Sequence, residues 1–170
     1  MPGKGTKMKT TSQNRANTLT RAAIIAALYA ALTLLLSPMS FGLVQVRVSE
    51  ALTLLPILMP EAVPALFVGC LIANFLGGAT ILDIVFGSLA TLLAAACTRV
   101  LRGRLLPAML MPVLFNGVIV GLVVRFAYSP GVPAALCMLS VAAGEAVSCL
   151  LLGPLMLRAL ERIPQKMLHS

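Results

Sequence analysis

The chain has 170 residues, of which 59% are hydrophobic and 11% are charged, and its formal net charge at pH 7 is +8. In a soluble domain about a quarter of all residues are charged, because water must solvate its surface. So few charges exclude an ordinary soluble domain and indicate a protein whose surface lies in lipid. The chain contains one histidine, His169, and four cysteines that lack metal or redox spacing. We therefore expect no metal site, no cofactor and no Ser-His or Cys-His catalysis.

The first predicted elements are a polar tail and a long apolar helix. Residues 1–17 are basic and aperiodic, which predicts a flexible cytoplasmic tail. The apolar run over 19–36 predicts the first membrane helix, which ends before Pro38 because proline cannot continue a helix. No small-x-small cleavage site follows this run, so we expect an uncleaved helix rather than a signal peptide. Alternating apolar and polar residues over 44–48 predict a short extended segment.

Five more apolar runs follow, separated by glycine, proline or charged residues. They predict helices over 49–59, 61–76, 81–100, 106–126 and 133–160. The second helix is interrupted at Pro56, and Gly77-Gly78 ends the third. Six helices of this kind make an all-α integral membrane protein with one transmembrane domain over 18–162 and a short tail over 163–170.

The basic residues predict the orientation of this bundle. With six crossings, every lysine and arginine except Arg47 and Arg125 falls on the side of the two termini. Loops rich in lysine and arginine stay in the cytoplasm, which predicts a multi-pass protein of the bacterial cell membrane with both termini cytoplasmic. The basic residues form no stripe with interleaved aromatic residues, so the net charge does not predict nucleic-acid binding.

Glu145 is the acidic residue that a structural role explains least easily. It lies in the middle of the predicted helix over 133–160, where a buried carboxylate costs several kcal/mol unless it is paired or faces a water-filled cavity. We expect it to bind a ligand, with an ion pair to Arg125 as the alternative. The helix dipole explains Glu61, at a helix start, with contact to a cytoplasmic partner as the alternative. Glu161 lies in a basic last turn, where water solvates it.

Several other polar residues map to the outer half of the predicted bundle or just below it. The predicted substrate-binding set is Glu145, Asn116, Asn74, Asp83, Glu50, Arg47 and Gln45. Structural alternatives are an interhelical hydrogen bond for Asn116 and a helix cap for Asp83. A local ion pair between Arg47 and Glu50 is a third. The simplest common explanation is a pocket open to the outside and floored by Glu145.

The first helix carries two rows of small residues at four-residue spacing. The rows are Ala22, Ala26 and Ala30, and Ala23, Ala27 and Ala31. Such rows let another helix approach closely, either from a partner or from the same chain.

Three stretches of the sequence resemble the QueT family. They are residues 44–56 (VQVRVSEALTLLP), 60–74 (PEAVPALFVGCLIAN) and 83–92 (DIVFGSLATL). The resemblance extends over about residues 18–162 and is most specific over 44–92. The last two predicted helices match in length and in carrying Asn116 and Glu145.

The resemblance implies a function that composition alone does not give. QueT proteins are substrate-binding S-components of energy-coupling-factor (ECF) transporters. They have six helices and an outer pocket for a queuosine precursor or salvage product, a 7-deazaguanine base or nucleoside. The resemblance implies that a transmembrane coupling protein and two ATPase subunits are the partners, and that Ala22, Ala26 and Ala30 contact the coupling protein. The chain itself would be a non-catalytic subunit.

A guanine-like edge suits the predicted site. Its adjacent N–H and amino groups both donate to a carboxylate such as Glu145, and Asn74 or Asn116 would read its carbonyl oxygen. The candidates for stacking on the base are Phe41, Phe75, Phe115 and Tyr128.

Three other functions compete with this hypothesis. The chain could be an S-component for a different vitamin-like solute or a membrane scaffold without a ligand. A small intramembrane enzyme is the third alternative, and the sequence lacks the Gly-x-Ser-x-Gly elbow and the paired aspartates that such an enzyme needs.

Overall fold

The computed structural model describes residues 4–37 and 46–162, and every regular element in these two ranges is helical. The first elements are α1 (Lys4–Leu35), the 3₁₀ helix η1 (Val48–Ile57) and α3 (Ala62–Leu76). The π-helical segment η2 (Asp83–Gly87) continues directly into α4 (Ser88–Val100). One further helical stretch contains α5 (Leu105–Phe115), η3 (Asn116–Val120), α6 (Gly121–Val123) and η4 (Val124–Tyr128). The last stretch contains α7 (Ala134–Ala146), η5 (Val147–Leu152) and α8 (Gly153–Glu161).

Four helical stretches are long and apolar enough to cross a membrane. They are Gln13–Leu35, Asp83–Val100, Leu105–Tyr128 and Ala134–Leu160. Large apolar side chains such as Leu139 and Leu151 are exposed on their surfaces, as a lipid environment requires. The predicted all-α class is therefore confirmed, with four helices that could span a membrane. η1 and α3 are shorter apolar helices, so the count of six crossings and the cytoplasmic termini stay predictions.

The predicted helix boundaries hold in the middle of the chain and fail at its start. α1 begins at Lys4 rather than near residue 19, and the flexible cytoplasmic tail over 1–17 stays a prediction. Once an apolar segment has nucleated a helix, each added residue gains a hydrogen bond, and no proline interrupts this stretch. Gly77 ends α3 as predicted, and Gly78 adopts a positive φ of 71° that favours glycine.

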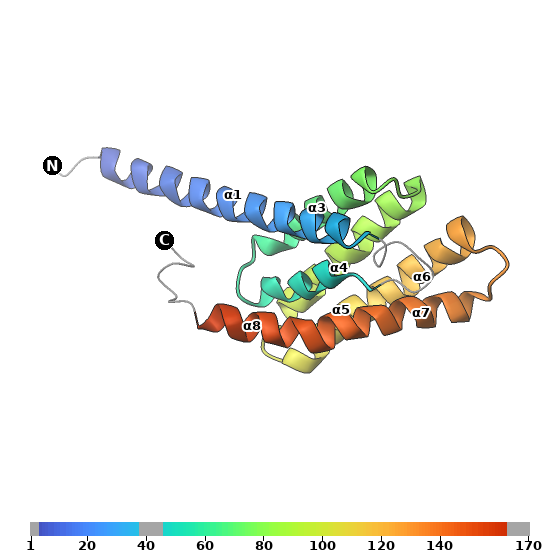
Figure 1. Ribbon diagram of the computed structural model, residues 1–170. Helices are drawn as coiled ribbons and strands as arrows, with labels where there is room; N and C mark the ends of the chain where they lie inside the picture. The colour runs from blue at the N-terminus through green and yellow to red at the C-terminus, as the bar shows by residue number, and fades with distance from the viewer. Residues whose placement is uncertain (1–3, 38–45, 163–170) are drawn as a thin grey trace.

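η1 lies at the centre of the bundle. Figure 1 draws it between α1 and the α7–α8 helix, and it also contacts α4. Its residues from Ser49 to Pro56 are all buried. The short extended segment predicted before it is described only at Val46 and Arg47, where Arg47 has an extended backbone.

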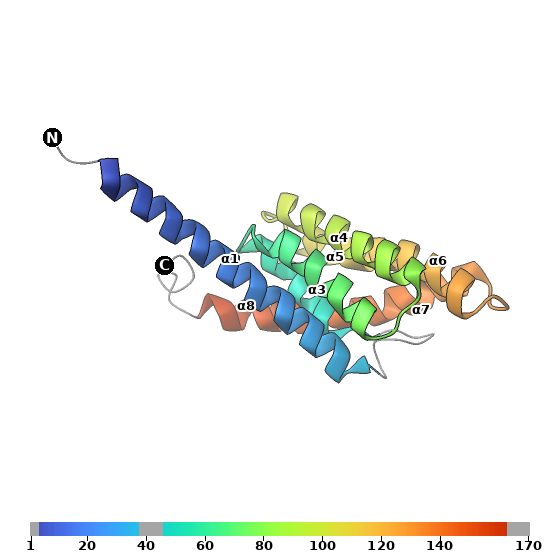
Figure 2. The same ribbon diagram turned by 90° about the horizontal axis from the view of Figure 1, so that it is seen from above.

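α1 packs closely against α3 and then extends past the rest of the bundle at its N-terminal end (Figures 1 and 2). A Cβ atom on Gly69 of α3 would lie 2.7 Å from the Ala26 carbonyl oxygen, so only glycine permits this approach. Ala26 and Ala30 are buried in this contact, and Ala22 packs at its edge. The row is therefore used in packing within the chain, and its contact with a coupling protein stays a prediction.

The second alanine row of α1 has the opposite environment. The side chains of Ala23, Ala27 and Ala31 are exposed. The two rows lie on different faces of the helix because they are offset by one residue, or about 100°. The exposed row, and not the predicted one, is accessible to another helix.

Candidate functional site

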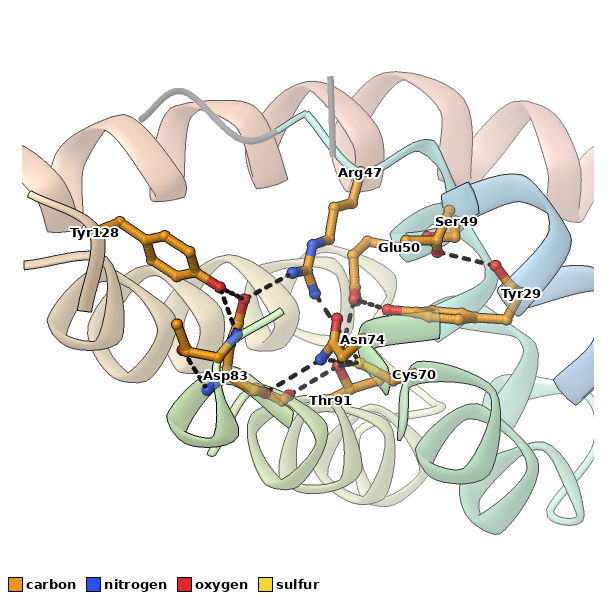
Figure 3. A network of polar contacts seen from close by, with 12 residues as sticks. Tyr29, Arg47, Ser49, Glu50, Cys70, Asn74, Asp83, Thr91 and Tyr128 are labelled. Carbon is orange, nitrogen blue, oxygen red and sulfur yellow. Dashed lines mark hydrogen bonds and ion pairs between the residues drawn. The ribbon is translucent and has the colours of Figure 1, made fainter. Parts of the chain in front are cut away.

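Polar side chains from seven helical elements and from Arg47 meet in the middle of the bundle, which we call the polar centre, and Figure 3 shows the part of it around Arg47, Glu50 and Asp83. Its members are Tyr29, Arg47, Glu50, Asn74, Asp83, Thr91, Asn116 and Glu145, and each is at most 2% exposed. Burying so many polar groups inside an apolar protein is costly unless they are paired or serve a ligand.

Glu50 is one of the three carboxylates of this centre, with Asp83 and Glu145. Its Oε1 atom accepts hydrogen bonds from the Tyr29 hydroxyl and, at 3.3 Å, from Thr91 Oγ1. Its Oε2 atom is buried and has no hydrogen-bond partner within the described part of the chain. The protein thus satisfies one oxygen of Glu50 and leaves the other available.

Arg47 pairs with Asp83 rather than with Glu50. Its Nη2 atom lies 3.5 Å from Asp83 Oδ2, and both side chains are almost fully buried. The Tyr128 hydroxyl donates to the same oxygen at 3.3 Å. The expected local ion pair between Arg47 and Glu50 is therefore not the main contact of Arg47, although the two charges are close enough to interact.

The Asp83 carboxylate does not cap its own helix. The Asp83 backbone N–H donates to Thr80 Oγ1 at 3.4 Å, while the Asp83 side chain points to Arg47 (Figure 3). The capping alternative for Asp83 is thus wrong.

Asn74 connects α3 to η2 at this site. Its Nδ2 atom donates to the Asp83 carbonyl oxygen at 3.1 Å, and its Oδ1 atom has no hydrogen-bond partner among the residues described. A Cβ atom on Gly87 would lie 2.7 Å from Asp83 Oδ1 and 3.3 Å from Asn74 Nδ2. Gly87 therefore leaves the space that these two polar side chains occupy.

Glu145 lies on the other side of Glu50, and Cys149 bridges the two residues. Cys149 Sγ donates to the Glu50 carbonyl oxygen at 3.5 Å and lies 3.9 Å from Glu145 Oε2. The Asn116 amide is close enough to interact with both carboxylates, but its Nδ2 atom makes no hydrogen bond of normal geometry in the described structure. The interhelical hydrogen bond considered for Asn116 stays a prediction, because its amide lies near the Glu50 and Glu145 carboxylates of two other helices.

Arg125 does not neutralise Glu145. Its guanidinium donates to the Pro130 carbonyl oxygen and lies 5.9 Å from the centre of the Phe126 ring. The alternative prediction, an ion pair between Arg125 and Glu145, is therefore wrong.

Irregular helical geometry positions the site residues. Asp83 and Asn116 are each the first residue of a π-helical segment, and Glu145 lies two residues before another. Glu50 is on the 3₁₀ helix η1. Such departures from α-helical geometry re-aim side chains and are frequent at functional sites.

The structure brings together six of the seven predicted site residues. The seventh, Gln45, lies outside the described residues, as does the stacking candidate Phe41. Phe75 is 68% exposed, whereas Tyr128 reaches the polar centre through its hydroxyl. Sequence reasoning missed Tyr29, although a tyrosine inside a membrane helix usually needs a partner for its hydroxyl.

The polar centre has the properties of a binding site. Unpaired buried atoms from four elements converge there, and they are Glu50 Oε2, Asn74 Oδ1, Asp83 Oδ1 and Asn116 Nδ2. Each unsatisfied buried group costs about 1–3 kcal/mol, so their concentration in one place suits a ligand that pairs with them. Among the described residues, no cluster of three His, Cys, Asp or Glu side chains has the arrangement of a metal site.

The fold and this site define a helical membrane protein with a buried polar centre inside the bundle. The chain belongs to the QueT transporter family, whose model, described as "QueT transporter", matches residues 19–162. A stretch of 72 residues is 43% identical to the "Queuosine precursor transporter QueT" of Lactococcus lactis subsp. cremoris (strain MG1363). This match covers 41% of the present chain and 42% of that relative. No solved structure matches the chain.

Proposed function

We propose that this chain is the substrate-binding S-component of an ECF importer and that its polar centre binds a 7-deazaguanine queuosine precursor. The observation that carries this proposal is the set of unpaired, buried donor and acceptor atoms beside Glu50 and Glu145. Membership of the QueT transporter family and the similarity to the queuosine precursor transporter of Lactococcus lactis support the class of solute.

The chemistry of a guanine-like edge fits these atoms. Adjacent N–H and amino groups donate to one carboxylate, and a carbonyl oxygen accepts from an amide N–H. Glu145 has a thiol as its contact at Oε2, and Asn116 Nδ2 is the unpaired donor beside it. We therefore assign the N–H and amino edge to Glu145 and the carbonyl oxygen to Asn116.

The charge of the polar centre bears on which precursor fits best. Arg47 pairs with Asp83, whereas Glu50 and Glu145 are neighbours that repel each other when both are ionised. A ligand that carries a positive charge relieves this repulsion. We expect a 7-deazaguanine with a protonated amine to bind at least about tenfold more tightly than a neutral analogue of the same size, or about 1.4 kcal/mol.

Transport by such a subunit requires partners. The sequence contains no G-x-x-x-x-G-K-[ST] phosphate-binding loop, so we assign ATP hydrolysis to two partner ATPases and energy transfer to a transmembrane coupling protein. The exposed row of Ala23, Ala27 and Ala31 is the surface on α1 that permits close approach of a partner helix. Co-purification with a tagged chain tests this assignment, and Ala27→Trp should abolish it. A matched change on the surface of α7, Leu139→Trp, should leave it intact.

Calorimetry of the purified full chain without ATP tests the ligand assignment. The wild type should bind a 7-deazaguanine base or nucleoside, and Glu145→Gln should weaken binding about 10- to 100-fold because the amide cannot accept both donors. Glu61→Gln, at the Arg21–Glu61 ion pair, is the matched control and should bind normally.

Two outcomes would contradict this assignment. If no 7-deazaguanine binds while another vitamin-like solute does, the chain is an S-component for a different substrate. If no solute binds and Glu145→Gln stabilises the fold, a membrane scaffold without a ligand is the correct function.

A further inference from the structure

A groove far from the polar centre combines an apolar floor with two arginines. It lies where the α4–α5 turn, the end of η1 and α8 meet, and its volume is about 270 Å³. Its lining residues are Ile57, Arg102, Leu105, Pro154, Leu157 and Arg158.

The two arginines lie at the depth where membrane helices end. Arg102 falls between the stretches Asp83–Val100 and Leu105–Tyr128, and Arg158 lies near the end of Ala134–Leu160. Both side chains are exposed. Because the ends of membrane-spanning helices lie near the lipid headgroups, the guanidinium groups are at the level of phospholipid phosphates.

The surface around the groove carries exposed apolar side chains. Leu105 in the groove is 47% exposed, and Leu106 and Leu155 beside it are 61% and 66% exposed. Among the residues whose side chains the structure describes, no acidic residue lines the groove, and the ion pairs Arg21–Glu61 and Arg47–Asp83 lie elsewhere. A ligand here must therefore offer an anion at the headgroup level joined to an apolar chain.

A second and larger cavity at the same end of the bundle does not meet this requirement. It measures about 420 Å³ and contains Arg21, Arg99 and Glu61. Arg21 pairs with Glu61, and Arg99 donates to the Pro56 and Ile57 carbonyl oxygens at 2.9 and 3.1 Å. Its charges are already engaged within the chain.

We propose that the groove between the α4–α5 turn and α8 binds one anionic phospholipid, with its phosphate on Arg102 and Arg158 and an acyl chain along Leu105 and Leu157. This site is independent of the solute that the polar centre binds. It contacts the end of η1 through Ile57. A bound lipid would therefore support the helix that carries Glu50.

Native mass spectrometry of the full chain, titrated with phosphatidylglycerol or phosphatidylcholine in detergent, tests the proposal. We expect one phosphatidylglycerol to be retained, and the double variant Arg102→Gln/Arg158→Gln to weaken its retention at least about tenfold, since each interfacial arginine contributes to anionic lipid binding. Arg104→Gln is the matched control, because Arg104 is exposed in the same turn but does not line the groove. Inorganic phosphate should not displace the lipid.

Three results would overturn this inference. They are equal retention of both lipids by the wild type, unchanged retention by the double variant, and an equal loss in the Arg104 control. If the double variant does not fold, Arg102→Lys/Arg158→Lys replaces it. That variant keeps the charge and should retain the lipid within about threefold.

Discussion

Two ion pairs of similar geometry have opposite environments in this protein. Arg47 and Asp83 are separated by 3.5 Å in the polar centre, with side chains that are 3% and 0% exposed. Arg21 and Glu61 are separated by 3.7 Å where α1 passes the start of α3, with side chains that are 22% and 12% exposed. Because the two distances are nearly the same, the environment decides how much each pair contributes to the stability of the fold.

The difference between the two pairs indicates where this chain tolerates substitutions. Water screens and solvates the partly exposed pair, whose contribution is small. The buried pair is surrounded by other polar groups that have lost their water, and removing one partner leaves a charge without compensation. The polar centre should therefore be sensitive to single substitutions, and the Arg21–Glu61 pair should be insensitive.

The largest effect is expected from Arg47→Ala. It leaves Asp83 buried without its cation, which should lower the free energy of unfolding by about 3–5 kcal/mol. Thermal unfolding in detergent measures this loss. The double variant Arg47→Met/Asp83→Leu removes both charges and should recover much of the stability. A single variant as stable as the wild type would contradict the view that the pair is buried and essential.

An intermediate effect is expected from Tyr29→Phe. The change removes the hydroxyl that donates to Glu50 Oε1 while keeping the ring, so a buried acceptor loses one of its two donors. We expect a loss of about 1–3 kcal/mol in unfolding free energy. Thr33→Val is a useful comparison, because Thr33 is also a buried polar residue of α1 but bonds Ser49 instead. Ligand affinity should fall in Tyr29→Phe and not in Thr33→Val.

The smallest effect is expected from Arg21→Gln. It breaks the pair with Glu61 but leaves both positions in contact with water, so unfolding free energy should change by less than about 1 kcal/mol. Raising the salt concentration should reduce even this difference. A loss as large as that of Arg47→Ala would mean that the two regions do not differ as proposed.

The positions of the site residues could be predicted from the sequence, but their contacts could not. Glu50, Asn74, Asp83, Asn116 and Glu145 stood out because charged and amide side chains are rare in apolar helices. Their partners were mostly mistaken, since Arg47 pairs with Asp83 and Arg125 does not reach Glu145. The reason is that contacts between residues far apart in the chain depend on helix rotation, which packing decides.

The alanine rows of α1 illustrate the same limit. Their four-residue spacing marked two surfaces for close helix approach, and the spacing alone does not favour either row. The structure buries Ala26 and Ala30 against α3 because Gly69 leaves room for the Ala26 carbonyl. The neighbouring row is left exposed.

By itself, the sequence determined that this is an all-helical membrane protein, where most of its helices end, and which polar residues require an explanation. Composition and periodicity are properties of short segments, so they can be recognised in the sequence. Within lipid each apolar segment must form a helix, because every backbone group must bond within its own helix. Only the tertiary structure decided that a short 3₁₀ helix occupies the centre and brings Glu50 beside Glu145. That arrangement depends on how six helical stretches pack around one another. A pattern within one stretch of sequence does not predict this packing.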